Sequence, residues 1–281
     1  MSAPPVTAVV PTRNSARTVG ACLSSLRGQT HQPLEVVVVD NASSDGSDRI
    51  AAEWADQLLR AGPERSAQRN RGASRGEGAF LLFVDSDMLL EPTVVAECVA
   101  AAAAGADAVV IPEQSFGDGF WARCKALERS CYVGDDSIEA ARFFTREVFE
   151  SVGGYDEELA GTEDWDLHER VRRAGARLDR IAPLIWHDEG HLRLAQLTAK
   201  KFHYGRTFGQ YLAKHPRLAR TQAHPFRIAF VRHRRRLAAD PVTALGMVAM
   251  KATEAAAGAA GLVSVKLRVP TSASSPRYRG G

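Results

Sequence analysis

The sequence predicts an α/β fold in which a mostly parallel sheet is flanked by helices and followed by a basic, helical C-terminal extension. Three observations lead to this prediction. Short apolar runs alternate with segments of helical periodicity through the first half of the chain. Each of the first three apolar runs ends in a polar loop. After about residue 217 the pattern changes to an arginine-rich segment, an alanine-rich segment and a polar tail.

The first three strands are each expected to pair with a helix of the chain. Residues 6–10, 34–39 and 80–84 are the three apolar runs, and the last two lack the alternation of a half-exposed strand. After the first run, apolar residues recur at helical spacing over 19–26, and after the second run they do so over 50–58. Residues 68–76 are expected to form a helix before the third run. Right-handed crossovers then make the strands parallel, and the polar loops gather at their carboxyl ends.

The later elements are less regular. Helices are expected over 93–104, 120–127 and around 167–171, with strands at 108–111 and 142–145. A strand region at 178–185 is broken by Pro183, and a helix is expected from His191 through Lys214. We place a domain boundary near Arg217, which gives a catalytic domain at 1–216, a basic and apolar helical extension at 217–270 and a disordered tail at 271–281.

Composition excludes several classes of protein. The chain of 281 residues is 45% hydrophobic and 25% charged, as expected of a folded globular protein. Its 36 Lys and Arg against 33 Asp and Glu leave a net charge of +3, which argues against nucleic acid as a partner. The four cysteines form no C-x-x-C pair, so buried thiols are expected in preference to zinc ligands. The first residues lack a signal-peptide pattern, which predicts a cytoplasmic protein.

Two carboxylates follow the strand at 80–84. Asp85 and Asp87 flank Ser86 in one short loop, and carboxylate oxygens suit Mg²⁺ or Mn²⁺ on a diphosphate. Acidic loops after strands also cap helices, so this pair alone does not decide the function. The same sheet edge is expected to carry the polar segments 11–14, 40–46 and 69–72, which together indicate a binding site.

Six segments resemble the glycosyltransferases of family 2 with the GT-A fold, in order and in spacing: 9–14, 38–46, 68–72, 83–87, 153–157 and 162–167. The resemblance covers roughly residues 6–187. It implies a Rossmann-like, GT-A type sheet and an enzyme that moves a sugar from a nucleoside diphosphate donor to a hydroxyl acceptor. It also implies inversion at the anomeric carbon and a divalent cation, Mg²⁺ or Mn²⁺, on the diphosphate.

The resemblance further implies which residues surround the donor and its cation. The residues expected around the nucleotide and diphosphate are Pro11, Thr12, Asp40, Asp45, Arg69, Asn70 and Asp85. The expected metal ligands are Asp85, Asp87, as the principal ligand, and His187. Three alternatives remain open. Asp45 with Gly46 also fits a turn and helix cap, Arg69 with Asn70 fits a solvated helix face, and His187 fits a hydrogen-bonded surface histidine.

The acidic pair Glu163-Asp164 matches the position of the family's catalytic acids, at the start of a helix near the acceptor. Inverting transfer needs a carboxylate to take the proton of the acceptor hydroxyl, and we assign this role to Asp164, with Glu163 as the alternative base. A helix N-terminus stabilises such anions and reduces their basicity, which burial against Trp165 would offset. Both could instead be ordinary helix-start acids.

The C-terminal segment combines positive charge with an apolar stretch. Seven arginines lie between 217 and 236. The weakly polar stretch 241–265 follows, and Lys251 and Glu254 within it argue against a membrane span. An interfacial helix on an anionic membrane surface and a solvated basic face fit equally well. The first of these places the protein at the cytoplasmic face of the membrane.

The sequence thus favours an inverting, metal-dependent glycosyltransferase. The expected donor is a UDP-sugar or GDP-sugar, and the expected acceptor is a glycan, cell-envelope intermediate or polyprenyl-linked molecule. Two alternatives remain. One is a catalytically silent GT-A module that binds a nucleotide sugar or a partner protein. The other is a nucleotidyltransferase, which needs a glycine-rich phosphate loop where the chain has residues 11–14.

Overall fold

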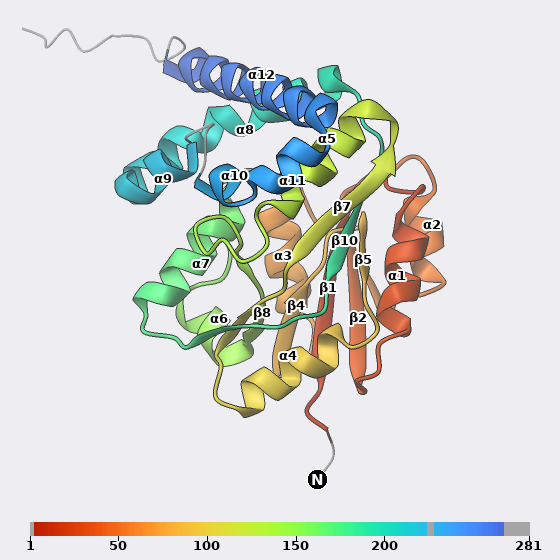
Figure 1. Ribbon diagram of the computed structural model, residues 1–281. Helices are drawn as coiled ribbons and strands as arrows, with labels where there is room; N and C mark the ends of the chain where they lie inside the picture. The colour runs from red at the N-terminus through yellow and green to blue at the C-terminus, as the bar shows by residue number, and fades with distance from the viewer. Residues whose placement is uncertain (1–2, 224–227, 267–281) are drawn as a thin grey trace, which may run out of the picture.

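The computed structural model describes residues 3–223 and 228–266. The predicted tail at 271–281 and the end of the predicted extension lie outside the described residues. The core of the molecule is a seven-stranded sheet (Figure 1). In spatial order its strands are β3 (Gln57–Arg60), β2 (Leu34–Asp40), β1 (Val6–Thr12), β4 (Phe80–Phe83), β8 (Ala141–Thr145), β6 (Ala108–Val110) and β9 (Leu178–Arg180).

The sheet is mostly parallel, as predicted. The pairs β1 with β2, β1 with β4, β2 with β3 and β6 with β9 are parallel, whereas β8 runs antiparallel to both of its neighbours. In the pairing of β1 with β2, Thr12 lies beside Asp40, so both strands end at the same edge. That edge is where the polar loops meet.

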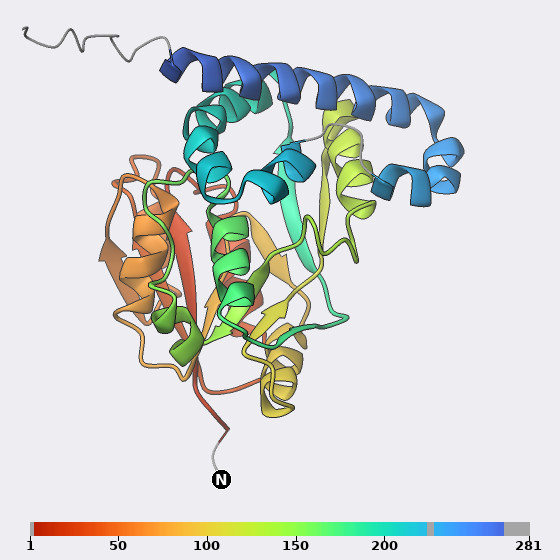
Figure 2. The same ribbon diagram turned by 90° about the vertical axis from the view of Figure 1, so that its left-hand side faces the viewer.

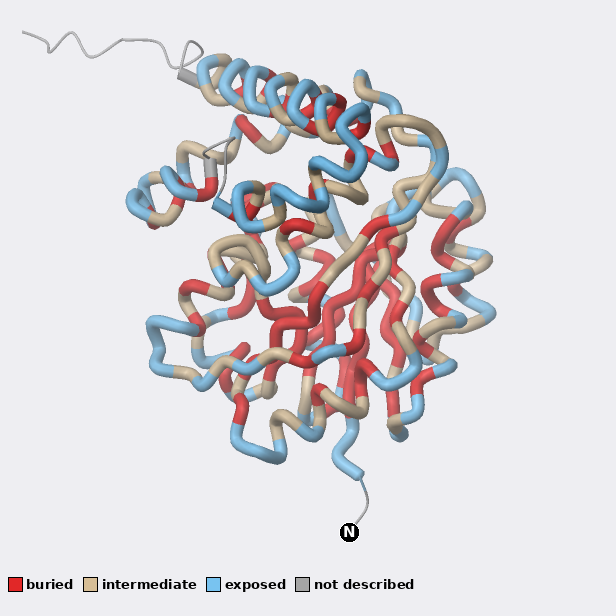
Figure 3. The backbone as a smooth tube through the Cα atoms, in the orientation of Figure 1, coloured by how far each residue is buried: buried red, intermediate tan, exposed pale blue. Residues whose placement is uncertain are grey.

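Helices cover both faces of this sheet (Figures 1 and 2). On one face, α1 (Val19–Arg27), α2 (Ser47–Ala52) and α4 (Val94–Ala103) pack their apolar residues against strand side chains such as Val36 and Val38. On the other, α3 (Arg65–Ala73), α6 (Arg146–Ser151) and α7 (Glu163–Arg173) pack against Val37 and Val39. Alternate residues of β2 therefore face opposite layers, and Figure 3 shows the buried strands between them. The four cysteines are free and buried.

A smaller three-stranded sheet lies beside the first (Figure 1). Its order is β5 (Met88–Leu90), β10 (Ile185–His191) and β7 (Glu113–Asp118). The pairing of β10 with β5 sets His187 opposite Met88, one residue after Asp87. The amide of Asp188 also donates to the carbonyl of Asp87 at 2.8 Å. This sheet thus brings His187 to the loop that carries Asp85 and Asp87.

The remaining helices form a layer at one end of the molecule. It comprises α5 (Gly119–Ser130), α8 (Leu194–Lys214), α9 (Pro216–Ala223), α10 (Ile228–Arg232), α11 (Arg234–Ala239) and α12 (Pro241–Lys266). The long α12 lies across α8 and α5 (Figures 1 and 2). A Cβ on Gly205 would lie 2.1 Å from the carbonyl oxygen of Gly258, so the α8 and α12 backbones touch there. The division at Arg217 stays a prediction, although α12 packs on two helices that precede it.

Two expectations about elements are corrected, and the predicted break at Pro183 is confirmed. The second helix ends at Ala52, and Leu58 lies in β3 opposite Val38, because backbone pairing with β2 replaces the helix that the apolar spacing suggests. Residues 178–185 contribute to two strands in different sheets, β9 and β10, with Pro183 between them. His191 ends β10, and α8 begins at Leu194. Among the described residues, none of the helices combines the length and apolar character that crossing a membrane requires.

Candidate functional site

A cavity of about 310 Å³ opens at the carboxyl ends of β1 and β4, and we call it the strand-end cavity. Three segments build it: the end of β1 with the loop 13–18, the face of α3 that carries Arg65 and Gln68, and the loop 85–87. Gln68 supports this arrangement because its amide donates to the carbonyl oxygens of Thr12 at 3.0 Å and Val39 at 2.6 Å. The predicted convergence of polar segments therefore occurs.

The residues predicted to surround a nucleotide divide into two groups. Pro11, Thr12 and Asp85 line the strand-end cavity, and the hydroxyl of Thr12 is buried there without a hydrogen-bond partner in the described part of the chain. Asp40 and Asp45 do not line it. Asp40 accepts from the amide of Ser43 at 2.9 Å, and Asp45 accepts from the amide of Ser47 at 3.0 Å.

The contacts of Asp45 match the turn and cap alternative. Its carboxylate also accepts from the amide of Ala16 at 3.0 Å, which ties the loop after β1 to the start of α2. The hydroxyl of Ser47, which donates to Asp45 Oδ1 at 2.5 Å, contributes most to lowering the pKa of Asp45, and the amide of Ala16 contributes next. Contacts of Asp40 and Asp45 with a donor stay predictions, but both carboxylates already hold the loops that frame the cavity.

Arg69 is the centre of a buried ion-pair network. Its side chain has no exposed surface. One terminal nitrogen lies 2.6 Å from Asp85 Oδ1, and the other lies 2.9 Å from Asp164 Oδ1 and 3.4 Å from Glu163 Oε1. The guanidinium carbon also lies 4.9 Å from the ring centre of Tyr155. Arg69 therefore faces acidic side chains and not solvent, and the solvated-face alternative does not describe it.

Asn70 anchors a loop. Its amide donates to the carbonyl of Tyr155 and to Glu157, both at 2.9 Å, while its oxygen accepts from the amide of Tyr155 at 2.9 Å. These bonds hold the segment 153–157 against α3. Gly154, with φ of 67°, packs against Asn70, and a Cβ on Gly154 would lie 2.8 Å from the side-chain oxygen of Asn70. Asn70 thus shapes the approach to α7.

The charge of Asp85 is stabilised by three arginines. Burial alone would raise the pKa of Asp85, but Arg69, Arg65 and Arg142 hold it well below its usual range. Arg65 lies 3.5 Å and Arg142 3.8 Å from Asp85 Oδ2. Asp85 is therefore ionised at neutral pH, and its two oxygens face cations of the protein.

Asp87 is the carboxylate available to a divalent cation. Its side chain is 46% exposed, and it lines the strand-end cavity. His187 Nδ1 lies 3.8 Å from Asp87 Oδ1, and His187 Nε2 lies 2.8 Å from Glu113 Oε2. Among the described residues, no three His, Cys, Asp or Glu side chains form a ready-made metal cage. One carboxylate at a polar cavity nevertheless fits Mg²⁺, which is commonly held by one or two carboxylates plus substrate phosphates.

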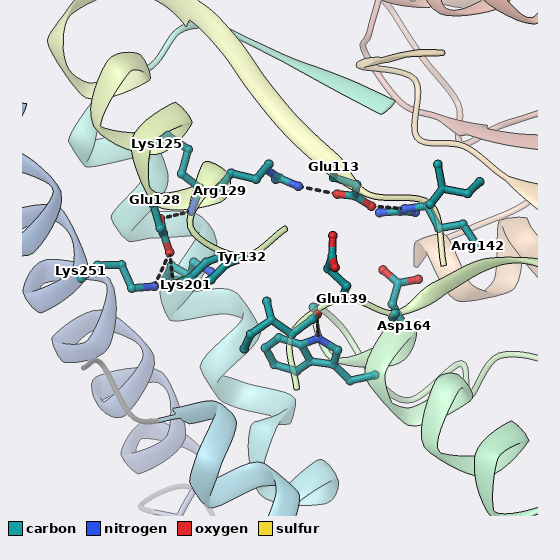
Figure 4. Close-up of a pocket in the computed structure, with 15 residues that line it drawn as sticks. Glu113, Lys125, Glu128, Arg129, Tyr132, Glu139, Arg142, Asp164, Lys201 and Lys251 are labelled. Carbon is teal, nitrogen blue, oxygen red and sulfur yellow. Dashed lines mark hydrogen bonds and ion pairs between the residues drawn. The ribbon is translucent and has the colours of Figure 1, made fainter. Parts of the chain in front are cut away.

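A second cavity of about 240 Å³ is lined by Asp164, which Arg69 links to Asp85 of the first, and we call it the Asp164 cavity (Figure 4). Asp164 is 27% exposed, and its Oδ2 has no hydrogen-bond partner in the described ranges. Glu163, by contrast, is 2% exposed and lies 3.2 Å from Arg65. Of the two acids at the start of α7, the structure therefore places Asp164 at the cavity.

Several residues of this cavity were not found by sequence reasoning. Glu139 lines it with one oxygen buried and without a hydrogen-bond partner among the described residues, and burial raises the pKa of this carboxyl although Arg180 pairs with it. Glu113 contacts Arg142 and Arg129 at the top of the view in Figure 4. Lys201 of α8 and Lys251 of α12 complete the wall. They come from irregular or C-terminal segments, and no motif in the sequence signals them.

Together, the mostly parallel sheet and the two cavities at its polar edge define an α/β protein with a GT-A type fold. Residues 7–152, just over half of the chain, match Glycosyl transferase family 2, and the chain belongs to that family. The predicted family and the predicted fold are both confirmed.

Two curated relatives illustrate the range of similarity. The chain is 31% identical over 237 residues to the pre-mycofactocin glycosyltransferase of Mycobacterium tuberculosis, covering 75% of this chain and 48% of that protein. It is 28% identical over 233 residues to the succinoglycan biosynthesis protein ExoA of Rhizobium meliloti, covering 74% of this chain and 70% of that one. The chain thus spans about half the length of the first of these relatives.

Two solved structures share the fold. The mannosyltransferase PcManGT of Pyrobaculum calidifontis, in complex with GDP-Man and Mn²⁺, aligns with a TM-score of 0.64 at 22% identity, covering 94% of this chain and 87% of that one. S. aureus TarS with UDP-GlcNAc aligns with a TM-score of 0.51 at 18% identity, covering 74% of this chain and 66% of that one. At these identities the likeness concerns the fold alone.

Proposed function

We propose that the protein transfers a sugar from a nucleoside diphosphate donor to a hydroxyl of an acceptor, with inversion at the anomeric carbon. The observation that carries the proposal is the network of Arg69. This one cation contacts Asp85 of the strand-end cavity and Asp164 of the neighbouring cavity. A donor in the first cavity and an acceptor in the second would meet across these residues. Family membership and the nucleotide sugars bound by PcManGT and TarS support the same assignment.

In this proposal the protein positions both substrates. The unpartnered hydroxyl of Thr12 and the side chain of Arg65 line the strand-end cavity, where they can hydrogen-bond to a nucleotide or its diphosphate. Arg69 holds Asp164 through Oδ1, which leaves Oδ2 for the acceptor hydroxyl. Asp164 takes that proton as the acceptor oxygen forms its bond to the anomeric carbon, and the bond to the diphosphate breaks on the opposite face.

A divalent cation, Mg²⁺ or Mn²⁺, bound through Asp87 would supply positive charge to the departing diphosphate. His187 lies beside Asp87 and is held by Glu113, and in this proposal it would contact the diphosphate. Asp85 is the less suitable ligand because arginines occupy its surroundings. We therefore assign Asp85 to the structural network and Asp87 to the cation.

The test is release of free nucleoside diphosphate from a panel of UDP-sugars and GDP-sugars in the presence of Mn²⁺. Hydrolysis of the donor, with water in place of the acceptor, releases the same nucleoside diphosphate, so an acceptor need not be known. We expect wild type to release product from at least one donor and the double variant Asp87→Ala, Asp164→Asn to release none. Tight binding of a nucleotide sugar with no release from any donor would instead identify a catalytically silent module.

We further propose that the C-terminal layer contacts the anionic face of a membrane. Exposed apolar side chains lie beside exposed arginines there: Ile228 is 74%, Val231 64%, Val242 67% and Leu245 72% exposed. Arg232 of α10 and Arg234 and Arg235 of α11 are exposed as well, between the apolar residues of α10 and those of α12 in the chain, whereas Arg227 lies outside the described residues. Each arginine near an anionic surface contributes on the order of 1 kcal/mol.

Co-sedimentation with liposomes tests this contact. The full chain should pellet with anionic liposomes at low salt, remain free with neutral ones, and dissociate as salt is raised. The variant Ile228→Ser, Leu245→Ser should bind more weakly. Recovery of the full chain in the supernatant with anionic liposomes at low salt would exclude membrane contact.

A further inference from the structure

Three lysines from three different helices meet at one wall of the Asp164 cavity (Figure 4). They are Lys125 of α5, Lys201 of α8 and Lys251 of α12. Two buried carboxylates, Glu128 and Glu254, lie among them. We call these five residues the lysine cluster.

The carboxylates of the cluster are already occupied. Lys125 lies 2.8 Å from Glu128 and 3.2 Å from Glu254, and Lys251 lies 2.7 Å from Glu128 and 2.9 Å from Glu254. Lys201 forms no ion pair or hydrogen bond within the described ranges. Three ammonium groups therefore face two carboxylates, and Lys201 carries the surplus charge.

The other acids nearby do not neutralise Lys201. Glu113 pairs with Arg142 and Arg129, Glu139 pairs with Arg180, and Asp164 pairs with Arg69. Burial, together with the charges of Lys125 and Lys251, lowers the pKa of Lys201 to about 8, although Glu254 and Glu128 act in the opposite direction. A cation held in this way in a cavity is stabilised by an incoming anion.

Lys201 also stands where the Asp164 cavity meets a third cavity, of about 320 Å³, and both share Trp165 and Lys251. We call the third cavity the α8–α12 groove. Glu254, Thr162 and Gln222 also line it, and the rest of the lining is apolar or small and comes mostly from the two helices, including Tyr204, Phe208, Ala255 and Leu262. The glycines of α8 and α12 let these two helices approach closely.

We propose that the acceptor is an amphiphile with a phosphate group, in which the phosphate pairs with Lys201 and an apolar chain occupies the α8–α12 groove. This inference rests on the proposed function and specifies its acceptor. The hydroxyl that receives the sugar would then lie toward Asp164, in the same cavity as Lys201. A lysine ammonium commonly binds phosphate. The negative charge of a phosphate would offset the positive charge of Lys201 and the repulsion between Lys201 and the other lysines of the cluster.

The test measures binding without a donor, by isothermal titration calorimetry at pH 7. The probes are farnesyl phosphate, farnesol as the neutral chain, and inorganic phosphate as the chainless anion. The variants are Lys201→Met, Lys201→Arg and, as a matched control, Lys200→Met, because Lys200 is the exposed neighbour on the same helix. Thermal melting of each variant shows that it is folded.

We expect wild type and Lys200→Met to bind farnesyl phosphate equally, Lys201→Met to bind it about tenfold or more weakly, and Lys201→Arg to retain most of the affinity. Affinity should fall between pH 7 and pH 9.5, because Lys201 loses its proton in this range, and this loss should be absent in Lys201→Arg. Ala255→Trp, which fills the groove, should weaken farnesyl phosphate and leave inorganic phosphate unchanged.

Equal binding of farnesol and farnesyl phosphate would overturn the role of Lys201. Equal binding of inorganic phosphate and farnesyl phosphate would overturn the role of the groove. Because no donor is present, these results are independent of nucleoside diphosphate release. A chain that binds farnesyl phosphate through Lys201 but hydrolyses no nucleotide sugar would refute the proposed function and leave the binding site in place.

Discussion

Replacing Arg69 by methionine should destabilise the protein strongly, because it removes the centre of a buried charge network. Methionine keeps most of the side-chain volume, so the loss of charge is the main change. Arg69 contacts Asp85, Glu163 and Asp164 at 2.6, 3.4 and 2.9 Å and is fully buried. Removing one partner of a buried ion pair leaves an uncompensated charge and costs about 3–5 kcal/mol.

The neighbouring arginines determine whether the loss of stability lies at the lower or the upper end of this range of about 3–5 kcal/mol. Arg65 remains 3.5 Å from Asp85 and 3.2 Å from Glu163, and Arg142 remains 3.8 Å from Asp85. We therefore expect the lower end, about 3 kcal/mol at pH 7, or a fall in melting temperature of roughly 6–12 °C for a protein of this size. Arg65→Met is the control. Its partly exposed side chain should be less costly to remove.

The pH dependence distinguishes charge from packing. In wild type the depressed pKa of Asp85 contributes stability above the pKa of the unfolded chain, and this contribution is lost as pH falls through the folded pKa. In Arg69→Met much of that contribution is already absent. The stability difference between the two proteins should therefore be largest near pH 7 and shrink below about pH 4. Urea unfolding at both pH values measures it. A difference under about 1 kcal/mol at pH 7, or one that does not change with pH, would refute the reasoning.

Three further predictions address the cavities and the helical layer. Asp164→Asn should lower transfer by about 10² to 10⁴ with donor affinity retained, and a variant that keeps half of the wild-type turnover would exclude Asp164 as the base. Asp87→Ala should abolish the dependence of nucleoside diphosphate binding on Mn²⁺, measured by calorimetry with and without EDTA; unchanged dependence contradicts the cation role. Gly205→Ala should lower stability by about 1–3 kcal/mol, because the added methyl group would clash with the Gly258 carbonyl. Gly209→Ala meets only a flexible leucine and should be neutral or stabilising. Equal melting temperatures of these two variants would contradict the close contact between the helices.

The sheet could be predicted from sequence because its strands are buried on both faces. Residues 34–39 and 80–84 are apolar without alternation, which only a strand covered by helices tolerates. Strand β3 was missed because it lies at the edge, where the apolar spacing of Ile50, Trp54 and Leu58 fits a helix equally well. Pairing with β2 makes the β3 segment a strand and not a helix, and this pairing is a tertiary contact that local sequence does not reveal.

The site was predictable only in part. Contact of the motif residues with a donor stays a prediction, and the turn and cap role of Asp45 was one of the expected alternatives, whereas the motif did not indicate that Asn70 holds a loop or that Arg69 is buried among acids. A motif indicates which residue type occupies a position, but it does not indicate whether that residue contacts the ligand. Glu139 and Lys201 carry no motif because their environment comes from distant segments, Arg180 in one case and α5 with α12 in the other.

The two cavities differ in the parts of the chain that build them, and this difference has a consequence for specificity. The strand-end cavity is formed within residues 11–87, inside the segment that matches the family. The Asp164 cavity adds Asp164 and Lys201, which lie beyond that segment, and Lys251 of α12. Donor binding should therefore follow the family, whereas acceptor choice should follow the C-terminal helices. Substitutions in α12 that face Lys201 should accordingly change acceptor affinity while the affinity for a nucleoside diphosphate stays constant.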